Sequence, residues 1–232
     1  MKKRRRIFVI NLPERTDRRR QTISELRRAQ FPEVVFYPAI RPSDFFPFGS
    51  LGERGCFLSH KAVLEAARDS EEVLVLEDDV SFQVPYASIC ERLDQLPSSW
   101  EFFYGGYLGE IAEHSLTTRE NGVIQIASDA ELIGAHCYAV NGPAIPKLLS
   151  ALEIFLSRPR GHPEGGPMPI DGAFNVARRQ MGLETFALTP SAAYQRSSRT
   201  DIGSLKWFDR TPVIKQLASA LRGIKRKLLP KL

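Results

Sequence analysis

An apolar run that ends in three consecutive acids is the feature of this sequence that most restricts its fold. Val73-Leu74-Val75-Leu76 leads directly into Glu77-Asp78-Asp79, which predicts a buried strand with negative charge at its carboxyl end. Because a buried carboxylate without a cation is strongly unfavourable, we expect a divalent metal here. Ligands of open α/β sheets bind outside the carboxyl ends of the strands, and oxygen ligands favour Mg²⁺ or Mn²⁺. The alternative is a solvated turn after a strand.

The composition indicates one globular domain. The chain has 232 residues, and the 43% that are apolar suffice to fill a core. It has no run of about 18 apolar residues, so we expect no transmembrane helix. The basic residues 1–6 have the character of a signal-peptide start, but the apolar stretch 7–12 is too short and indicates a strand instead.

The three cysteines, Cys56, Cys90 and Cys137, lie in apolar stretches. Since their number is odd, we expect reduced thiols, as in a cytosolic protein, and no disulfide framework. A zinc site would need closely spaced pairs of Cys and His, and we identify none.

Positive charge is concentrated at both ends of the chain. Residues 1–20 carry nine Lys or Arg against two acids, and residues 206–232 carry eight against one. Each end therefore has a charge of +7, and since the whole chain has +5, the residues between them carry −9. A nucleic-acid-binding protein more often spreads cations over a folded face with aromatic residues between them, so we expect no nucleic-acid partner. An anionic membrane surface is the better match.

Residues 206–232 have the pattern of a basic amphipathic helix. Apolar residues recur at spacings of three and four, and basic residues cover much of the remaining surface. The apolar positions are Ile214, Leu217, Leu221, Ile224 and Leu228. We expect a cytoplasmic protein that lies peripherally on the inner face of the cytoplasmic membrane through this segment. The alternative is a helix that packs its apolar stripe on the domain before it.

The rest of the sequence alternates between strand and helix patterns. We expect strands at residues 6–12, 34–37, 73–77, 100–107, 123–127, 134–140 and 185–193. We expect helices from Thr16 onward and at residues 55–68, 86–96, 143–152 and 170–181. Residues 158–169 contain four Pro and three Gly, which predicts a loop long enough to be a lid or a substrate loop. The alternation is typical of an α/β sheet, and we expect a single such domain at residues 1–205.

Several short blocks, taken in order, resemble glycosyltransferase family 25, which includes lipooligosaccharide galactosyltransferases. Together they span residue 7 to about residue 203. The blocks are Ile10 to Leu12 with Arg15 to Arg19, Gly55 to His60, Leu76 to Val80, Gly134 to Val140, Pro169 to Asp171, and Gln195 to Ile202. Arg196 interrupts the usual segment from glutamine to serine in the last block. The order of the blocks makes the set specific.

The resemblance implies a GT-A-like, Rossmann-type domain with a mixed central sheet. It implies transfer of a sugar, usually galactose, from a UDP-sugar to a glycan such as lipooligosaccharide, with inversion. It also implies that Glu77 and Asp79 hold Mn²⁺ or Mg²⁺, which acts as a Lewis acid on the diphosphate. An earlier carboxylate of the motif could meet the ribose, or Asp78 could bind the sugar hydroxyls.

Inversion needs a general base that takes the proton of the acceptor hydroxyl. Asp171 is the candidate, because it follows the Pro-rich loop at the start of a helix. The alternative is a plain N-cap. Asp201 and Glu164 are the next candidates.

Arginines after the first strand are candidates for the donor site. Arg18 and Arg15 could meet the nucleotide or its diphosphate, since guanidinium groups match phosphate geometry. Their alternative is a solvated helix start. Ser59 and His60 are expected at a helix start, where backbone N–H groups suit a phosphate or ribose. Their alternative is a cap with a packed histidine.

Further donor contacts come from three separate parts of the chain. His136 could bind the metal or the nucleotide, although a single histidine within an apolar strand is also a common core residue. By the resemblance, Asn11, Gln195 and Ser198 also belong to the donor site.

Three rival functions remain at this point. A sugar nucleotidyltransferase uses metal-binding acids on a related core but usually begins with a Gly-rich phosphate loop, and none follows Leu12. A metal-dependent phosphohydrolase would need further acids or His at metal spacing. A lipid-surface binding module would not need the acidic strand end.

Overall fold

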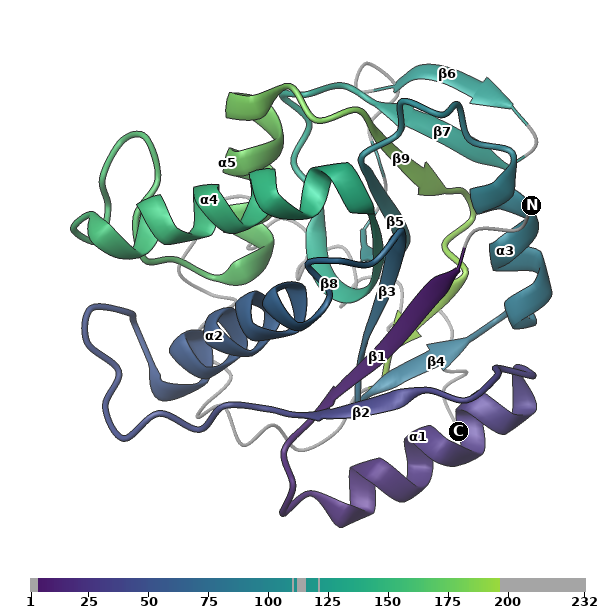
Figure 1. Cartoon of the computed structure of the whole chain (residues 1–232), viewed down its shortest axis with the longest axis horizontal. Helices are drawn as coiled ribbons and strands as arrows, with labels where there is room; N and C mark the ends of the chain where they lie inside the picture. Colours follow the sequence, from purple (N-terminus) through teal and green to yellow (C-terminus); the bar gives the residue numbers. More distant parts are fainter. Residues whose placement is uncertain (1–3, 110, 112–115, 121, 197–232) are drawn as a thin grey trace, which may run out of the picture. The chain divides into compact units, whose positions relative to one another are not determined.

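The computed structural model describes residues 4–109, 111, 116–120 and 122–196. Within them, an eight-stranded sheet has the order β2-β1-β3-β8-β5-β9-β7-β6, and a second sheet pairs β10 with β4 (Figure 1). The strands are β1 (Arg5–Asn11), β2 (Val35–Pro38), β3 (Glu72–Glu77), β4 (Val80–Phe82), β5 (Phe102–Leu108), β6 (Leu116–Glu120), β7 (Val123–Ile126), β8 (Ile133–Asn141), β9 (Thr185–Leu188) and β10 (Ala193–Gln195).

The large sheet is mixed. Strand β1 lies parallel to β2 and β3, and β5 lies parallel to β9, whereas β8 runs antiparallel to both β3 and β5. Strand β7 runs antiparallel to β9 and to β6. The prediction of an α/β fold with a mixed central sheet is confirmed.

Helices cover both faces of the large sheet. They are α1 (Thr16–Arg28), α2 (Leu51–Ala66), α3 (Tyr86–Asp94), α4 (Ile145–Ser157) and α5 (Ile170–Met181), with a 3₁₀ turn, η2 (Gly142–Ala144), before α4. Helices α2, α4 and α5 pack on one face, and α1 and α3 pack on the other (Figure 1). The sheet therefore lies between two layers of helices.

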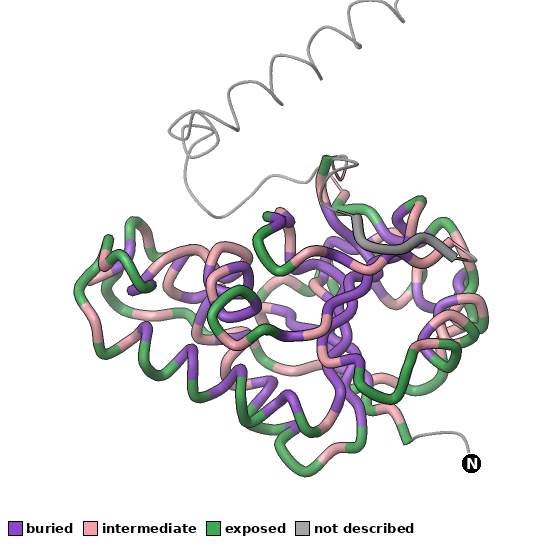
Figure 2. The backbone as a smooth tube through the Cα atoms, turned by 90° about the horizontal axis from the view of Figure 1, so that it is seen from above, coloured by how far each residue is buried: buried purple, intermediate pink, exposed green. Residues whose placement is uncertain are grey.

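The central strands are buried on both faces, which explains their continuous apolar sequences. In β3, Val73 and Val75 belong to the hydrophobic cluster under α2, α4 and α5, while Leu74 and Leu76 belong to the cluster under α1 and α3. All four are fully buried, and Figure 2 shows the buried residues concentrated along the central strands. A strand alternates its side chains between faces, so an apolar residue is needed at every position.

The carboxyl ends of β1 and β3 lie close to the starts of β8 and α5, at what we call the carboxyl edge of the sheet. Strands β1 and β3 are parallel, so Asn11 and Glu77 lie at the same edge. Strand β8 is antiparallel and starts there, with Cys137 opposite Leu76. The start of α5 joins this edge, since the Gly134 N–H donates to Asp171 Oδ2 over 3.2 Å. The acidic strand end therefore lies beside β8 and α5.

The structure corrects several predicted bounds. Helix α2 begins at Leu51, four residues before the predicted start, and the Ser50 side chain caps it by accepting from the Glu53 N–H. The strand predicted at 185–193 is two strands in different sheets, because Pro190 has no N–H to continue the ladder. Strands β4 and β6 were not predicted, and α4 begins at Ile145, after Pro143 has taken part in η2.

The predicted amphipathic segment 206–232, and with it the proposed boundary at residue 205, lies outside the described residues. Among the described helices, none combines the length and the apolar character required to cross a bilayer.

Candidate active site

Asp78 directly follows β3, and hydrogen bonds connect it to the end of β1 and to α1. Its Oδ2 accepts from Asn11 Nδ2 over 2.7 Å, and its Oδ1 accepts from Arg18 Nη1 over 2.9 Å. Its backbone oxygen accepts from Thr22 Oγ1 over 2.5 Å and from Arg196 Nη2 over 2.9 Å. Both side-chain oxygens of Asp78 are therefore engaged within the protein.

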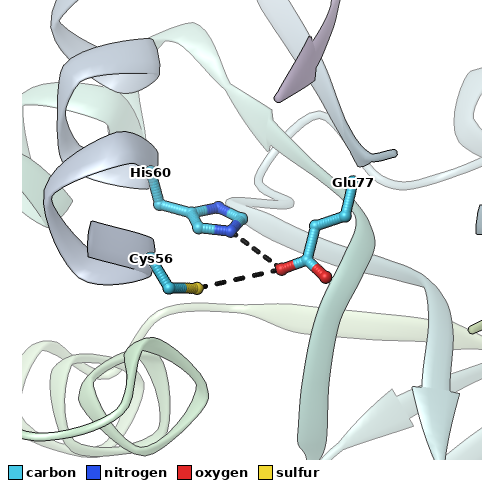
Figure 3. Close-up of side chains that lie close together, drawn as sticks. All are labelled: Cys56, His60 and Glu77. Atoms are coloured by element: carbon cyan, nitrogen blue, oxygen red, sulfur yellow. Dashed lines mark hydrogen bonds and ion pairs between the residues drawn. The ribbon is translucent and has the colours of Figure 1, made fainter. Parts of the chain in front are cut away.

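Glu77 turns toward α2. Its Oε1 lies 3.1 Å from His60 Nε2 and 4.0 Å from Cys56 Sγ (Figure 3). On its other side, the His60 ring meets the Tyr138 hydroxyl, which lies 3.0 Å from Nδ1. Burial acts to raise the pKa of Glu77, but the bond from His60, followed by the electrostatic effect of His60, outweighs it and holds the pKa below its usual value. Glu77 is therefore kept ionised.

Asp79 differs from Glu77. Its Oδ2 accepts from Gln195 Nε2 over 3.2 Å and lies 3.7 Å from Arg18 Nη1. Its Oδ1 is buried and has no hydrogen-bond partner among the described residues. Burial, followed by the negative charge of Glu77, raises the pKa of Asp79 to about 7. Two neighbouring carboxylates thus have pKa values shifted in opposite directions.

The donor set fits a divalent cation. Among the described residues, the ion pairs of Asp78 and Asp79 are both with Arg18, so one guanidinium serves two adjacent carboxylates. The unpartnered Asp79 Oδ1 is a buried oxygen that a cation would satisfy. Carboxylate oxygens are ligands that Mg²⁺ and Mn²⁺ prefer. Glu77 and Asp79 are therefore the residues that would hold such an ion.

His136 lies fully buried at the same edge. Its Nε2 donates to the Ala193 carbonyl over 3.1 Å, which leaves Nδ1 as the acceptor, and Nδ1 has no partner among the described residues. Burial lowers the pKa of His136, which favours the neutral ring. A neutral imidazole with a free acceptor nitrogen suits a metal or a donor hydroxyl.

Asp171 lies in the first turn of α5, but it is not the N-cap, which is Pro169. Its Oδ1 accepts from its neighbouring Gly172 N–H over 2.9 Å, and its Oδ2 from the Gly134 N–H. Burial raises the pKa of Asp171, although these two bonds act against the increase. Each carboxylate oxygen can accept two bonds, so both retain capacity for a further hydrogen.

Two residues that sequence reasoning did not select also belong to this acidic region. Burial raises the pKa of Glu53, and the Asp171 charge adds to the effect. Burial, followed by the charges of Glu77 and Asp171, raises the pKa of Cys56 well above its usual value. The acidic region therefore includes residues of α2 and α5 in addition to residues 77–79, which were the ones predicted from the sequence.

The helix-start interpretation of Ser59 and His60 is wrong. Both are buried within α2, well after its first turn. Ser59 Oγ donates to the Gly55 carbonyl over 2.6 Å and accepts from the Ile40 N–H over 2.7 Å, so it fixes the chain after β2. Both His60 ring nitrogens bond to protein groups.

The remaining predicted donor residues differ in position. Asn11, Arg18 and Gln195 lie beside the acids, as described above. Arg15 instead pairs with its neighbour Asp17, with Nη2 and Oδ2 2.9 Å apart. Ser198, and Asp201 as an alternative base, lie outside the described residues. Glu164, the other alternative base, is exposed and pairs with Arg158.

One signal in the sequence could have found the His60 cluster. Cys56 and His60 are four residues apart, so a helix places them on one face. The statement that the sequence lacks closely spaced Cys and His overlooked this pair. The contribution of Tyr138 had no local signal, because it lies 78 residues from His60.

Comparison with known proteins connects this site to one family. The model of glycosyltransferase family 25 (LPS biosynthesis protein) matches residues 49–155. Procollagen galactosyltransferase 2 of Homo sapiens is 32% identical over 126 residues, which cover 43% of this chain and 20% of that protein. A glycosyltransferase 25 family member of Aedes aegypti is 32% identical over 127 residues, which cover 43% and 21%. These matches confirm the resemblance.

A third relative limits what the matches imply about activity. Inactive glycosyltransferase 25 family member 3 of Homo sapiens is also 32% identical over 126 residues, which cover 43% of this chain and 21% of that protein. The matched region spans about a fifth of the length of these curated relatives.

Two solved structures have a similar arrangement of elements. A glycosyltransferase involved in glycosylation of the major capsid of PBCV-1 has a TM-score of 0.47 and 14% identity, over 79% of this chain and 80% of that one. A mutant Drosophila galactosyltransferase 7, in complex with manganese, UDP-Gal and xylobiose, has a TM-score of 0.45 and 12% identity, over 89% and 79%. Both scores lie below 0.5, and neither structure bears on the chemistry of this chain.

Proposed function

Because residues 49–155 match the model of glycosyltransferase family 25, we propose that this chain is a metal-dependent, inverting glycosyltransferase. The proposed donor is a UDP-sugar, with UDP-galactose the first candidate because relatives are named galactosyltransferases. The proposed acceptor is a glycan of the lipooligosaccharide class, since the family description refers to LPS biosynthesis. The observation that carries the proposal is the group of three carboxylates at residues 77–79, with Asp78 and Asp79 buried and Glu77 partly exposed, that ends β3 beside His136 and Asp171.

Glu77 and Asp79 would hold Mn²⁺ or Mg²⁺. When bound, the ion supplies positive charge that stabilises the diphosphate as it leaves. Glu77 is suited to this role because His60 keeps it ionised, and Asp79 because its Oδ1 lacks a partner. Asp78 would act differently, since its oxygens hold Asn11 and Arg18 in place.

Asp171 is the proposed general base. A base for an alcohol must be ionised before it can accept the proton, and an elevated pKa strengthens it as an acceptor. The burial of Asp171 raises its pKa, and the N–H groups of Gly134 and Gly172 fix its orientation. Asp171 would take the proton of the acceptor hydroxyl as the hydroxyl oxygen attacks the anomeric carbon.

Donor binding is proposed for the polar groups around the acids. Arg18 carries a guanidinium that is half-buried beside Asp78 and Asp79, where a diphosphate would bind close to the cation. Asn11, Gln195 and Ser198 are proposed to contribute hydrogen bonds. The unpartnered Nδ1 of His136 is proposed to accept a hydrogen from the donor or to bind the metal.

The proposal is tested by UDP release from a panel of UDP-sugars, with and without a lipooligosaccharide acceptor, in Mn²⁺, Mg²⁺ or EDTA. We expect acceptor-dependent release that EDTA abolishes and that Asp79→Asn reduces by at least about 10²-fold. Asp129→Asn is the matched control, because it makes the same change at an exposed acid. Full activity in EDTA or in Asp79→Asn would reject the metal assignment.

The same assay separates the rival functions. A sugar nucleotidyltransferase would form the UDP-sugar from UTP and a sugar 1-phosphate and release pyrophosphate. A phosphohydrolase would release product at the same rate without acceptor. The absence of all three reactions would place this chain with the relative that is named inactive.

We further propose, from the sequence of residues 206–232 alone, that the protein binds peripherally to an anionic membrane. An acceptor anchored in a bilayer would then be near the site. This proposal is independent of the metal assignment and is tested separately below.

A further inference from the structure

A line of hydrogen bonds connects two buried residues, Tyr138 on β8 and His60 on α2, to the partly exposed Glu77 at the end of β3. The Tyr138 hydroxyl lies 3.0 Å from His60 Nδ1, and His60 Nε2 lies 3.1 Å from Glu77 Oε1. Figure 3 shows the imidazole pointing from α2 directly at the Glu77 carboxylate. The line ends at a proposed metal ligand, and the inference below rests on that part of the proposed function.

The His60 ring is held in place by its neighbours. The His60 residue is 1% exposed, and its ring lies 5.6 Å from the Tyr138 ring and 6.2 Å from the Phe174 ring, measured between centroids. Tyr138 in turn stacks on Phe102, with centroids 5.3 Å apart. With its faces packed and both nitrogens bonded, His60 cannot contact a sugar nucleotide.

Donor and acceptor are fixed in the hydrogen bond between His60 and Glu77. An ionised carboxylate only accepts hydrogen bonds, so His60 Nε2 donates to Glu77 Oε1. This bond engages Oε1 and fixes the plane of the carboxylate, so the orientation of Oε2 toward a cation is fixed as well. A glutamate side chain has three rotatable bonds, so without this bond Glu77 would populate several orientations.

We propose that His60 is a positioning residue that holds Glu77 in the orientation required for a divalent cation, and that Tyr138 orients the His60 ring. Groups behind a metal ligand commonly have this role, and their loss costs about 10–100-fold in metal affinity or activity. His60 therefore acts through Glu77 and does not touch the substrate.

The same residues allow a competing interpretation. Cys56, His60 and Glu77 offer one ligand atom each, all within 4.8 Å of one another, which is a possible site for a thiophilic ion such as Zn²⁺. In the structure, however, His60 Nε2 is already bonded to Glu77, and Cys56 Sγ lies 4.0 Å from the same oxygen. The direct bond favours positioning over metal binding at His60.

The test measures Mn²⁺ affinity directly, by electron paramagnetic resonance of free Mn²⁺ in the presence of UDP, on the full chain. The variants are His60→Ala, His60→Gln and Tyr138→Phe. Tyr104→Phe is the matched control, because Tyr104 is equally buried in the same aromatic group but lies outside the line that joins Tyr138, His60 and Glu77.

We expect His60→Ala to weaken Mn²⁺ binding by about 10–100-fold. His60→Gln should recover part of the loss, since its amide can still donate to Glu77. Tyr138→Phe should weaken binding by a smaller factor, and Tyr104→Phe should leave it unchanged. In transfer assays, the Mn²⁺ concentration for half-maximal rate should rise, while the rate at saturating Mn²⁺ should return toward that of the wild type. A merely structural role would not raise the half-maximal Mn²⁺ concentration while leaving the rate at saturating Mn²⁺ close to that of the wild type.

Tyr138→Phe keeps the inference testable if His60→Ala does not fold, because it removes a single hydroxyl from a packed ring. Wild-type Mn²⁺ affinity in both Tyr138→Phe and His60→Gln would overturn the inference and leave the proposed function intact. Stoichiometric Zn²⁺ binding that is lost in both Cys56→Ser and His60→Ala would also overturn it, in favour of a metal centre. If the wild type binds no Mn²⁺ with UDP present, the inference and the metal assignment both fail.

Discussion

Arg160 Nη1 lies 3.1 Å from Glu53 Oε1, so an ion pair joins the loop between α4 and α5 to the first turn of α2. The Glu53 side chain is 5% exposed and the Arg160 side chain 46%. The loop at residues 158–169, predicted as a lid or substrate loop, is therefore attached next to the acidic region by one partly exposed arginine.

Arg160→Gln should release this loop from α2. We expect faster amide hydrogen exchange across residues 158–169, a higher KM for the acceptor and unchanged Mn²⁺ affinity. The loss of stability should be about 1 kcal/mol, because solvent reaches the arginine and weakens the pair. Lys147→Gln is the control, since it removes an exposed ion pair with Glu101 outside the loop. Unchanged exchange in the loop would show that other contacts hold it.

Asp79 should make the stability of the metal-free protein decrease as pH rises. The pKa of Asp79 is about 7 in the folded protein against 3.8 for an unperturbed aspartate, so the folded state binds the proton more tightly than the unfolded state. This contribution is fully present below pH 3.8 and is lost as pH rises toward 7. In EDTA, urea unfolding should show that Asp79→Asn becomes more stable than the wild type as pH rises from 5 to 8. The gain in the free energy of unfolding should be at least about 1.4 kcal/mol, which corresponds to one pKa unit. Mn²⁺ should remove this difference. An equal pH dependence in wild type and variant would mean that Asp79 ionises normally.

Asp171→Asn should separate binding from chemistry. The amide keeps the shape of the side chain but cannot accept the acceptor proton, so we expect normal UDP and Mn²⁺ binding with transfer reduced by about 10²–10⁴-fold. In the wild type, the acid limb of the kcat/KM profile should lie above the usual carboxyl range, because burial raises the pKa of Asp171. Wild-type turnover in the variant would exclude Asp171 as the base and make Glu53, Glu164 and Asp201 the next residues to test.

Deletion of residues 210–232 tests the membrane proposal. We expect transfer to a short soluble acceptor to be retained, while sedimentation with anionic liposomes is weakened. For the full chain, liposome binding should fall as salt is raised, because the attraction is screened. Equal binding by the full and truncated chains would reject the proposal, and an unfolded truncation would show that the apolar stripe belongs to the core.

Local patterns predicted the elements that are buried continuously or have clear boundary residues. The strand at 73–77 and the helix at 170–181 match β3 and α5 to within one residue. The start of α2 was missed because Gly52 was taken as a loop residue and Gly55 as the first residue of the helix. In the fold, Gly55 lies inside the helix, where a side chain would come within 2.7 Å of the Ile40 carbonyl. This glycine is required by tertiary packing that the sequence does not display.

The carboxylates of the site could be predicted for the same reason as β3, because they directly follow its apolar run. Their partners could not. Asn11 lies 67 residues from Asp78, and Gln195 lies 116 residues from Asp79. Which oxygen each partner occupies, and therefore which carboxylate remains open to a cation, depends on contacts that only the folded chain creates.

Asp78 lies where the chain passes from one sheet to the other, because Glu77 ends β3 in the large sheet and Val80 begins β4 in the small one. The Arg196 N–H bonds to the Asp79 carbonyl over 2.7 Å and extends the pairing of the small sheet. The separation of Glu77 and Asp79 is therefore set by the bend at Asp78 and by the groups that fix it. We expect the choice between ions of different radius to respond to substitution of Asp78, Asn11 or Arg196, although none of these is proposed as a ligand.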